Sequence, residues 1–363
     1  MLISNKSKQI VDSCRFCWMC RHICPIGNAT GQERNTARAR ALTLSLVERG
    51  AADFSGGIET NVYECALCGA CTKECATGWD PVAFTKEARN EIVMAGKAPA
   101  YVIKMLENID KTGNVYGQTE FCPDMLKAIE SVSAKTDILF FLGADARCKA
   151  ADKATKAIEL LKKAGIKFTV MANEPNSGYA LDFLAGAADE TKTAMTECAE
   201  TLNAYKTVVC YDPADAKVML RVYKEWGIDV KAEVKTFTSF LAEKIADGTI
   251  KAAKSDKVFY FQDPALLARD LEESEPARKV LAACGEVKEM LLFAKDVMWA
   301  GSSMMAEYLP KVMKLTAERR FADLKHVGGS VMVTASPSEY AALAAVKPDD
   351  VELYTIEEVV AGC

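Results

Sequence analysis

The chain has 363 residues, of which 50% are hydrophobic and 26% charged, and its formal net charge is −5. This balance is typical of a globular protein with large apolar cores, and the charge argues against a strongly basic nucleic-acid-binding protein. The sequence has no run of 18 apolar residues and no signal-peptide pattern at its start, so it predicts no membrane span.

Fourteen cysteines distinguish this composition, and eight of them form two runs near the amino end. Both runs have the spacing C-x-x-C-x-x-C-x-x-x-C, and their members are Cys14, Cys17, Cys20 and Cys24, then Cys65, Cys68, Cys71 and Cys75. In a chain of this size without a secretion signal, such runs indicate metal ligation rather than disulfides. With only two histidines, His22 and His326, a histidine-rich metal site is not expected.

The spacing of the runs favours iron–sulfur clusters over zinc. Structural zinc usually takes two separated Cys-x-x-Cys pairs or mixed cysteine and histidine ligands. In two-cluster ferredoxins the fourth cysteine of each run ligates the other cluster, and a proline often follows it, as Pro25 does here, whereas Ala76 follows the second run. The sequence therefore predicts two 4Fe–4S clusters, one held by Cys14, Cys17, Cys20 and Cys75, the other by Cys65, Cys68, Cys71 and Cys24.

Helical patterns surround both runs. The stretch 34–49 has Leu42 and Leu46 four residues apart and stops at Gly50, and Asp80-Pro81 is an N-cap and first-turn pair for a helix over 82–94. Residues 1–100 hold 12 basic and 10 acidic side chains, and the remainder holds 33 and 40. We expect an α-helical two-cluster ferredoxin-like domain over 1–110 and a linker over 111–135.

The basic residues of the first helix have two alternative roles. Arg34, Arg38 and Arg40 either balance cluster and partner charge or form a solvated helix face, and His22 is either a cluster neighbour or an ordinary polar residue. The sequence alone leaves both alternatives open.

Short apolar runs alternate with helical patterns through the rest of the chain, which favours parallel α/β sheets. The expected strands are 138–142, 167–171, 207–210, 230–234, 257–261, 287–292, 330–334 and 351–354, with helices ending near Lys163 and Gly227 and another over 237–246. Matching landmarks predict two α/β repeats, 136–250 and 251–363, around a shared cleft. The fold class is thus α followed by duplicated α/β.

Polar residues follow several of these strands: Asp145, Asn176, Asp212, Asp215, Asp263 and Ser336. They form either a polar site or helix caps, with Asp212 and Ser336 placed before helices and Asp263 before a proline. The sequence has no Gly-x-Gly-x-x-Gly and no Walker loop. We therefore expect that any flavin, FAD or FMN, lies on a partner subunit only, and we assign no catalytic residue.

Taken together, these residues resemble the iron–sulfur subunits of glycolate oxidase and anaerobic glycerol-3-phosphate dehydrogenase, and the heterodisulfide reductase subunit with duplicated cysteine-rich domains. The resemblance covers almost the whole chain and includes both cysteine runs. The helix start Ala37-Arg38-Ala39-Arg40 is similar to the Pro-Arg-Gly-Arg of that family, with both arginines kept.

The body departs from the family pattern at every cysteine-rich loop. The two Cys-Cys-Gly positions of the family read Asn176-Ser177-Gly178 and Trp299-Ala300-Gly301 here. The two Cys-Pro loops are replaced by Tyr211–Asp215 and Ser336–Glu339. The Asp-Pro-Cys reads Asp263-Pro264-Ala265, and the Gly-Cys after the first strand reads Gly143-Ala144. Because a non-cubane cluster needs those thiolates, we expect none in the body, and no disulfide reduction. The other cysteines, at 122, 148, 198, 210, 284 and 363, are expected to be buried or spare thiols.

The resemblance implies an electron-transfer subunit of a flavin-dependent oxidoreductase, not catalytic alone. Its two clusters would relay single electrons between an FAD-dependent dehydrogenase subunit and a further acceptor or donor, such as quinone, ferredoxin or electron-transfer flavoprotein. A reducing cytoplasm, anaerobic metabolism and peripheral membrane attachment through a partner agree with this role. The alternatives are a reductase with its own catalytic site in the C-terminal cleft, and a redox-sensing or structural component.

Overall fold

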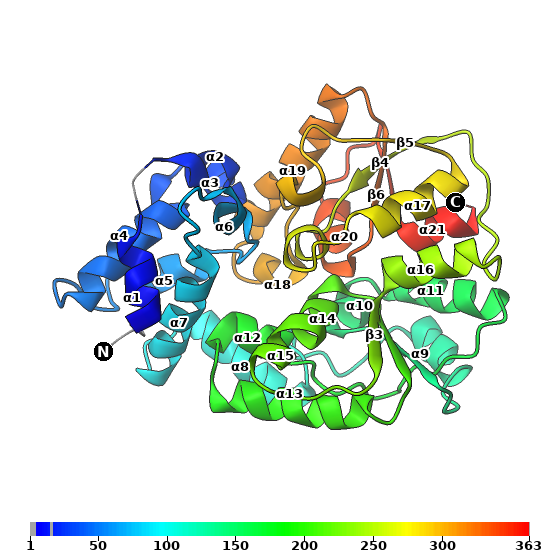
Figure 1. Cartoon of the computed structure of the whole chain (residues 1–363), viewed down its shortest axis with the longest axis horizontal. Coiled ribbons are helices and arrows are strands. Elements are labelled where there is room, and N and C mark those ends of the chain that lie inside the picture. Colours follow the sequence, from blue (N-terminus) through cyan, green and yellow to red (C-terminus); the bar gives the residue numbers. More distant parts are fainter. Residues whose placement is uncertain (1–4, 15–16, 363) are drawn as a thin grey trace.

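The computed structural model describes residues 5–14 and 17–362, and its amino-terminal part is helical (Figure 1). The predicted N-cap Asp80 accepts hydrogen bonds from Val82 N and Ala83 N, and Pro81 begins the following helix as expected. The helices of this part are α1 (Asn5–Asp12), α2 (Met19–Ile23), α3 (Pro25–Thr30), the 3₁₀ turn η1 (Glu33–Asn35), α4 (Ala37–Glu48), α5 (Ile58–Tyr63), α6 (Ala70–Glu74), α7 (Pro81–Met94) and α8 (Ala100–Thr112).

A first parallel sheet follows, with the order β1-β2-β3. Its strands are β1 (Ile138–Phe141), β2 (Thr207–Cys210) and β3 (Glu233–Thr236). The predicted strand 167–171 pairs with β1 only at Thr169, on the side away from β2. The helices of this half are α9 (Pro123–Glu130), α10 (Ala144–Lys149), α11 (Ala151–Lys163), α12 (Tyr179–Ala185), α13 (Asp189–Leu202), α14 (Pro213–Lys217), the π-helix η2 (Val218–Val222), α15 (Tyr223–Glu225) and α16 (Phe237–Ala246).

A second parallel sheet has the order β5-β4-β6-β7. Its strands are β4 (Val258–Gln262), β5 (Glu286–Lys288), β6 (Val331–Thr334) and β7 (Glu352–Thr355). With the Thr169 bridge counted at the outer edge, the first sheet has the same connectivity. The helices here are the π-helix η3 (Leu266–Asp270), α17 (Glu275–Cys284), the 3₁₀ turn η4 (Ala294–Asp296), α18 (Ser303–Ala306), α19 (Pro310–His326), α20 (Pro337–Ala344) and α21 (Ile356–Ala361).

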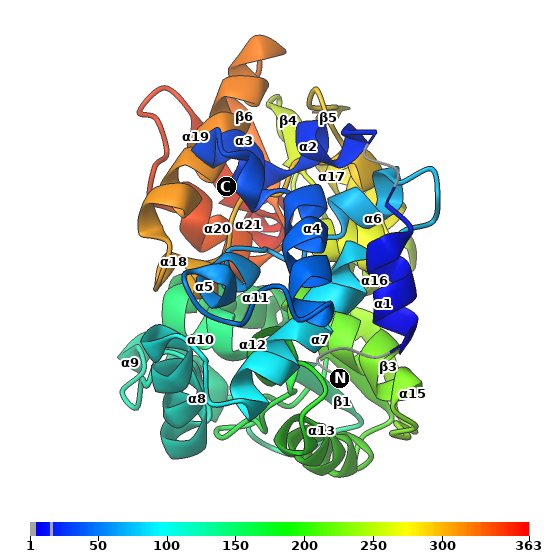
Figure 2. The same ribbon diagram turned by 90° about the vertical axis from the view of Figure 1, so that its left-hand side faces the viewer.

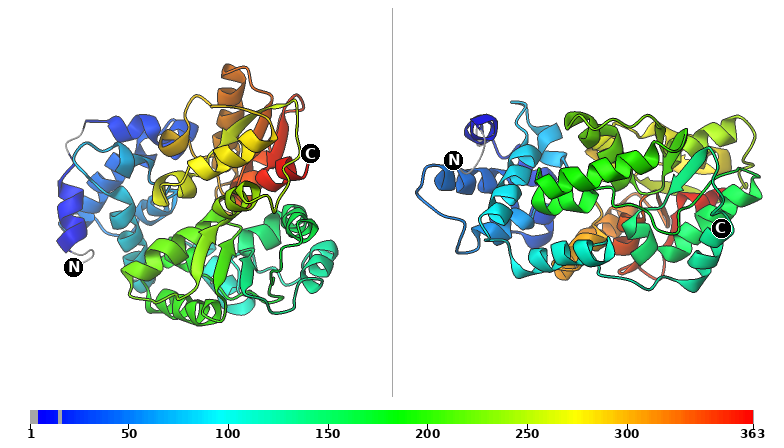
Figure 3. Two further views of the ribbon diagram at one scale, coloured as in Figure 1. Left: turned by 45° about the vertical axis from the view of Figure 1, so that its right-hand side comes forward. Right: turned by 90° about the horizontal axis from the view of Figure 1, so that it is seen from below.

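The two sheets share one hydrophobic core. Phe140 of the first sheet and Phe261 of the second belong to the same buried cluster, together with residues of α11, α16, α17 and α21. These four helices pack against one another between the sheets (Figures 1 and 3). Burying one face of each sheet in a common core removes a large apolar area from water, which stabilises the two halves as one body.

The segment that the sequence predicts to be a linker contains structure. Helix α9 lies within 111–135 and packs against α11, and its side chains Met125 and Ile129 are buried in the shared core. Its apolar face spans positions 125 and 129, four residues apart, so it reaches the core as an amphipathic helix does. The end of the linker segment is therefore packed against the first α/β half.

Candidate iron–sulfur centres and the pocket of the first sheet

The two cysteine runs match in backbone conformation at the residues that precede and follow their short helices. Trp18 and Gly69 occupy matching positions before the short helices α2 and α6, and both are left-handed, with φ of 70° and 72°. Cys24 and Cys75 follow these helices with nearly identical angles, φ −73° and −74°. Helix α2 packs beside α6 (Figure 2). The described parts of the two equally spaced runs therefore match and lie side by side.

The thiols of the two runs come together from both loops. Burial raises the pKa of Cys24 to about 11, and the neighbouring thiols of Cys68 and Cys65 add to this rise. Burial likewise raises the pKa of Cys71, which is also close to the thiols of both runs, and the pKa of Cys20, beside Cys14. Cys75 lies 3.2 Å from the hydroxyl of Thr77. Within the described residues, no group of three or more acidic, cysteine or histidine side chains has a geometry that could already hold a metal ion.

Two arginines beside this thiol cluster each have one buried side-chain nitrogen without an acceptor in the described part of the chain. Arg40 is 2% exposed; its Nε donates to Asn61 O at 3.0 Å, and its Nη2 has no partner in the described part of the chain. Arg269 Nε donates to Cys68 O at 2.6 Å, and its Nη2 is also buried without a partner there. A buried donor without an acceptor costs roughly 1–3 kcal/mol. An anionic cluster with sulfur acceptors would satisfy both groups, so the residues present fit such a cofactor.

Electrostatics support the same fit. The positive charge of Arg40 opposes the rise in the Cys24 pKa, and Arg269 does the same for Cys68, although burial outweighs both. A thiolate is the form that binds iron, so nearby cations favour ligation. When bound, 4Fe–4S clusters supply one-electron transfer at a potential set by charge, hydrogen bonds to sulfur and solvent exposure.

The first loop faces solvent. Cys17 is exposed, and the next residues, Trp18 and Met19, are 38% and 45% exposed. The Arg38 guanidinium stacks over the Trp18 ring at 3.9 Å. Large apolar side chains at the surface are candidates for partner contact, and here they adjoin a predicted cluster ligand.

The second loop is held by the rest of the chain. Cys68 is only 8% exposed, and its carbonyl is held by Arg269 from the second α/β half. Arg89, which is fully buried, donates from Nη2 to Cys65 O at 2.6 Å and from Nη1 to Phe183 O at 2.6 Å. Neither arginine is predicted from the sequence, because their partners lie far away in the chain. The π-helix η3, which carries Arg269, gives no recognisable pattern in the sequence.

The basic residues of η1 and α4 have different roles. Arg34 is exposed and pairs with Glu64 at 3.0 Å, Arg38 pairs with Glu33, and Arg40 is buried beside Cys24. Of the two alternatives, charge balance near the thiols describes Arg40, whereas Arg34 lies at the surface. His22 is exposed.

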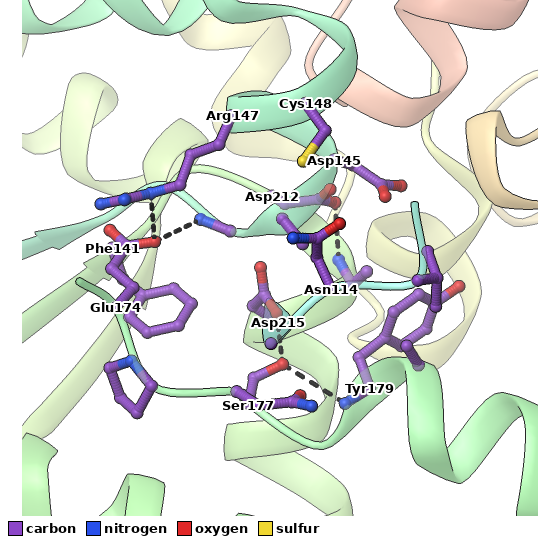
Figure 4. A pocket seen from close by; sticks show the side chains of 18 of the residues that line it. Asn114, Phe141, Asp145, Arg147, Cys148, Glu174, Ser177, Tyr179, Asp212 and Asp215 are labelled. Atoms are coloured by element: carbon purple, nitrogen blue, oxygen red, sulfur yellow. Dashed lines mark hydrogen bonds and ion pairs between the residues drawn. The ribbon is translucent and has the colours of Figure 1, made fainter. Parts of the chain in front are cut away.

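Four of the polar residues predicted in the body line one pocket of about 260 Å³ at the carboxyl ends of β1 and β2: Asp145, Asn176, Asp212 and Asp215 (Figure 4). Tyr179, Cys148 and Glu174 line the pocket as well, and the sequence did not predict Glu174 as a site residue. Asp263 and Ser336 lie outside this pocket. Tyr179 and Asp212 also line a cavity of about 20 Å³ that reaches Cys68 and Ser336.

Two of the three predicted helix caps are present and one is wrong. Asp212 Oδ1 accepts from Ala214 N at 3.0 Å, and Ser336 Oγ accepts from Glu339 N at 3.3 Å. Asp263 does not cap the helix that follows it: its two oxygens accept from Arg278 at 2.8 and 2.9 Å, and Oδ2 also accepts from Ala294 N at 2.7 Å. The cationic partner comes from α17, and a paired, buried carboxylate is more stable than one that accepts only from backbone N–H groups.

The remaining cysteines are mostly buried. Cys198, Cys210 and Cys284 are buried, Cys122 and Cys148 are partly exposed, and Cys363 lies outside the described residues. Of these cysteines within the described residues, only Cys148 lines the 260 Å³ pocket.

Comparison with known proteins identifies the amino-terminal part. Residues 10–79 match the model of the 4Fe–4S dicluster domain, so this region, with its eight cysteines, is such a domain. The chain is 26% identical over 362 residues to a subunit of the dihydromethanophenazine:CoB–CoM heterodisulfide reductase of Methanosarcina acetivorans, covering 90% of this chain and 87% of that protein. The corresponding protein of Methanosarcina mazei is 24% identical, with 77% and 74% covered.

The chain is thus a distant homologue of this reductase component over most of its length. Among solved structures it is similar to an aspartate racemase of Picrophilus torridus and to an aspartate racemase homologue of Pyrococcus horikoshii, each with a TM-score of 0.31. These share 9% and 10% identity and cover 62% of this chain, with 91% and 96% of their own length matched. No helix within residues 5–14 and 17–362 is long and apolar enough to cross a membrane.

Proposed function

We propose that this iron–sulfur electron-transfer protein relays single electrons through two 4Fe–4S clusters between a flavoprotein partner and a further acceptor or donor. The observation that carries the proposal is the pair of equivalent cysteine loops, one open to solvent at Cys17 and one clamped to the body at Cys68. An open cluster can exchange electrons with a partner, and a covered one can pass them onward.

The ligand sets follow the ferredoxin arrangement, in which each run lends its last cysteine to the other cluster. One cluster would be held by Cys65, Cys68, Cys71 and Cys24, and the other by Cys14, Cys17, Cys20 and Cys75. The closeness of Cys24 to the thiols of the second run supports the first set. Replacing Cys24 by Ser should therefore perturb the buried cluster, although Cys24 belongs to the run of the exposed one.

The body would be a duplicated α/β unit of the degenerate cysteine-rich type, with repeats 136–250 and 251–363. Its role in this proposal is to cover the second cluster and to bind partners. The relatives are subunits of a reductase by name, which supports membership of a multi-subunit complex. FAD or FMN would sit on the partner.

The test is anaerobic co-purification from the native cells with the full chain as bait. The expected result is a stoichiometric flavoprotein whose reduced flavin bleaches the visible absorption of the clusters. Cys68→Ser should lose one cluster and slow this transfer at least tenfold, whereas the control Cys122→Ser, outside both runs, should behave as the parent. Absence of any flavoprotein from the complex would reject the partner, and unchanged transfer in Cys68→Ser would reject the relay.

One observation favours a second candidate, a reductase with its own site in the body. The pocket of the first sheet and the small cavity at Cys68 have Tyr179 and Asp212 as common lining residues, which favours a site close to the buried cluster. This candidate requires turnover with a simple electron donor and no flavoprotein, abolished by Asp212→Asn with both clusters retained.

A further inference from the structure

The pocket of about 260 Å³ lies where an α/β sheet usually binds its ligand. The chain leaves β1 toward the Thr169 side and later returns to β2 on the opposite side, so the strand order reverses between β1 and β2. Ligands of open α/β sheets bind in the crevice outside the strand ends at this reversal. Phe141 at the end of β1, Gly143 after it and Asp212 after β2 line the pocket there.

The charges around the pocket are unbalanced. Asp145, Asp212 and Asp215 are 8%, 2% and 6% exposed, and in the described part of the chain none of them has an ion-pair partner. Each accepts one neutral hydrogen bond, from Tyr116 Oη at 2.6 Å, from Ala214 N, and from Ser177 Oγ respectively. Figure 4 shows the three carboxyl groups around the same space. Buried charges in proteins are normally paired, so this arrangement lacks a cation.

Two cationic side chains near the pocket, Arg147 in its lining and Lys149 on the Tyr116 ring, are already engaged. Arg147 donates from Nε to Glu174 at 3.1 Å and from Nη1 to Ala172 O at 2.7 Å, and its Nη2 donates to Met171 O. Lys149 pairs with Glu307 at 2.6 Å. Neither side chain can neutralise the three aspartates without giving up these bonds.

The pocket is closed to anions. Backbone N–H groups at strand ends and helix starts are the usual phosphate-binding donors. Here Leu142 N and Gly143 N donate to the Glu174 carboxylate at 2.8 and 3.0 Å, and Ala214 N donates to Asp212. The protein's own carboxylates therefore occupy the positions that an anionic ligand would need.

One oxygen of Asp212 remains available to a ligand. Asp212 is 2% exposed and its Oδ1 caps α14, but its Oδ2 accepts no hydrogen bond from any described residue although the side chain lines the pocket. Burial raises the pKa of this carboxyl well above its ordinary range, and Asp145 and Asp215 add to the rise, as expected where a positive charge is missing.

We propose that this pocket binds a small organic cation, with its ammonium or guanidinium group among the three aspartates and its carbon chain against Phe141 and Val115. Its volume is just below the ~300–1,000 Å³ of sites for drug-sized ligands, which fits a molecule the size of a short amine. A metal ion is the other cation class, but the apolar lining residues Phe141, Val115 and Met304 favour a ligand that carries a carbon chain. The proposal does not depend on the clusters.

The test is calorimetric titration of the anaerobically purified full chain with butylamine, putrescine and agmatine, and with butyrate, 1-butanol and Mg²⁺ as comparison probes. At least one amine should bind with one site per chain, and the comparison probes should not compete with it. Asp212→Asn should weaken that binding at least tenfold, because asparagine still caps α14 but carries no charge. The matched control Asp350→Asn, at an exposed carboxylate that pairs with Lys325, should bind as the parent does.

A second variant guards against misfolding. Ala180→Leu adds a side chain to the pocket wall on α12 and leaves every carboxylate in place, so it should also abolish amine binding. Iron content and circular dichroism equal to the parent would show that each variant folds. Failure of all three amines to bind, displacement of the amine by butyrate, or binding of Mg²⁺ in its place would overturn the proposal without touching the electron-relay function.

Discussion

The two α/β halves have the same strand connectivity but satisfy their buried charges differently. At the edge of the second sheet, Asp263 receives two hydrogen bonds from Arg278, which also binds Glu289. At the edge of the first sheet, Asp212 and Asp215 have no cationic partner in the described part of the chain.

A pair of equivalent positions shows the consequence. Asp215 lies five residues after the end of β2 and Glu339 five residues after the end of β6. Glu339 accepts from Ala265 N at 3.0 Å and from Gln262 Nε2 at 3.1 Å, so its side chain bridges to the neighbouring strand end. Asp215 makes no such bridge. At the carboxyl end of the second sheet, the hydrogen bonds of Glu339 to its neighbours fill the space between the strands. At the carboxyl end of the first sheet, Asp215 makes no such bonds to a neighbouring strand, and the pocket remains.

The largest effect should come from removing the cation that pairs with Asp263 at the carboxyl end of the second sheet. Arg278→Gln leaves the buried Asp263 without its cation and should lower the free energy of unfolding by about 3–5 kcal/mol. Urea denaturation measures this, with Lys325→Gln as a control at an exposed pair worth at most about 1 kcal/mol. Equal losses in the two variants would show that the second edge does not depend on its ion pair.

The opposite change removes the charge of one unpaired carboxylate, Asp215, at the carboxyl end of the first sheet. Burial raises the pKa of Asp215 from its ordinary 3.8 to about 7, so the folded state keeps a proton that the unfolded state releases between these values. Stability from this group is therefore lost as the pH rises toward 7. Asp215→Asn removes that loss and should be the more stable protein at pH 8, by up to about 4 kcal/mol. Parallel pH profiles of parent and variant would contradict the imbalance.

The smallest effect concerns the contact between the second half and the cysteine loops. Arg269→Gln removes a partly buried positive charge beside Cys68 and should lower the midpoint potential of the buried cluster by on the order of 60 mV, a tenfold change for one electron. EPR-monitored titration of the full chain measures both clusters. The exposed cluster serves as an internal reference, and Arg319→Gln, at the surface, should shift neither. An equal shift in the midpoint potentials of both clusters would contradict a specific effect of Arg269 on the buried cluster.

Local patterns predicted much of the fold. The helix 237–246 has the predicted bounds, and the stop before Gly165 and the Asp80 cap follow from residues within a few positions. The strand 167–171 was wrong as a full strand: Thr169 exchanges two backbone hydrogen bonds with β1 at 2.8 Å, and neighbouring residues do not continue the ladder.

The site was less predictable because its partners are distant in sequence. Arg269 and Cys68 are 201 residues apart, and Arg89 reaches Phe183 across 94. Asp263 follows a strand just as a cap residue does, and only the fold brings Arg278 to it. Residue type and spacing identified the eight cysteines, but which charges are balanced depends on tertiary contacts that no local pattern records.

The iron and acid-labile sulfide content of the full chain, isolated without oxygen, tests the central claim most directly. Two 4Fe–4S clusters require about eight irons and eight sulfides per chain, and reduction should give the EPR spectrum of two interacting clusters. Zinc in place of iron, about four irons, or a further iron centre beyond the two would contradict the account.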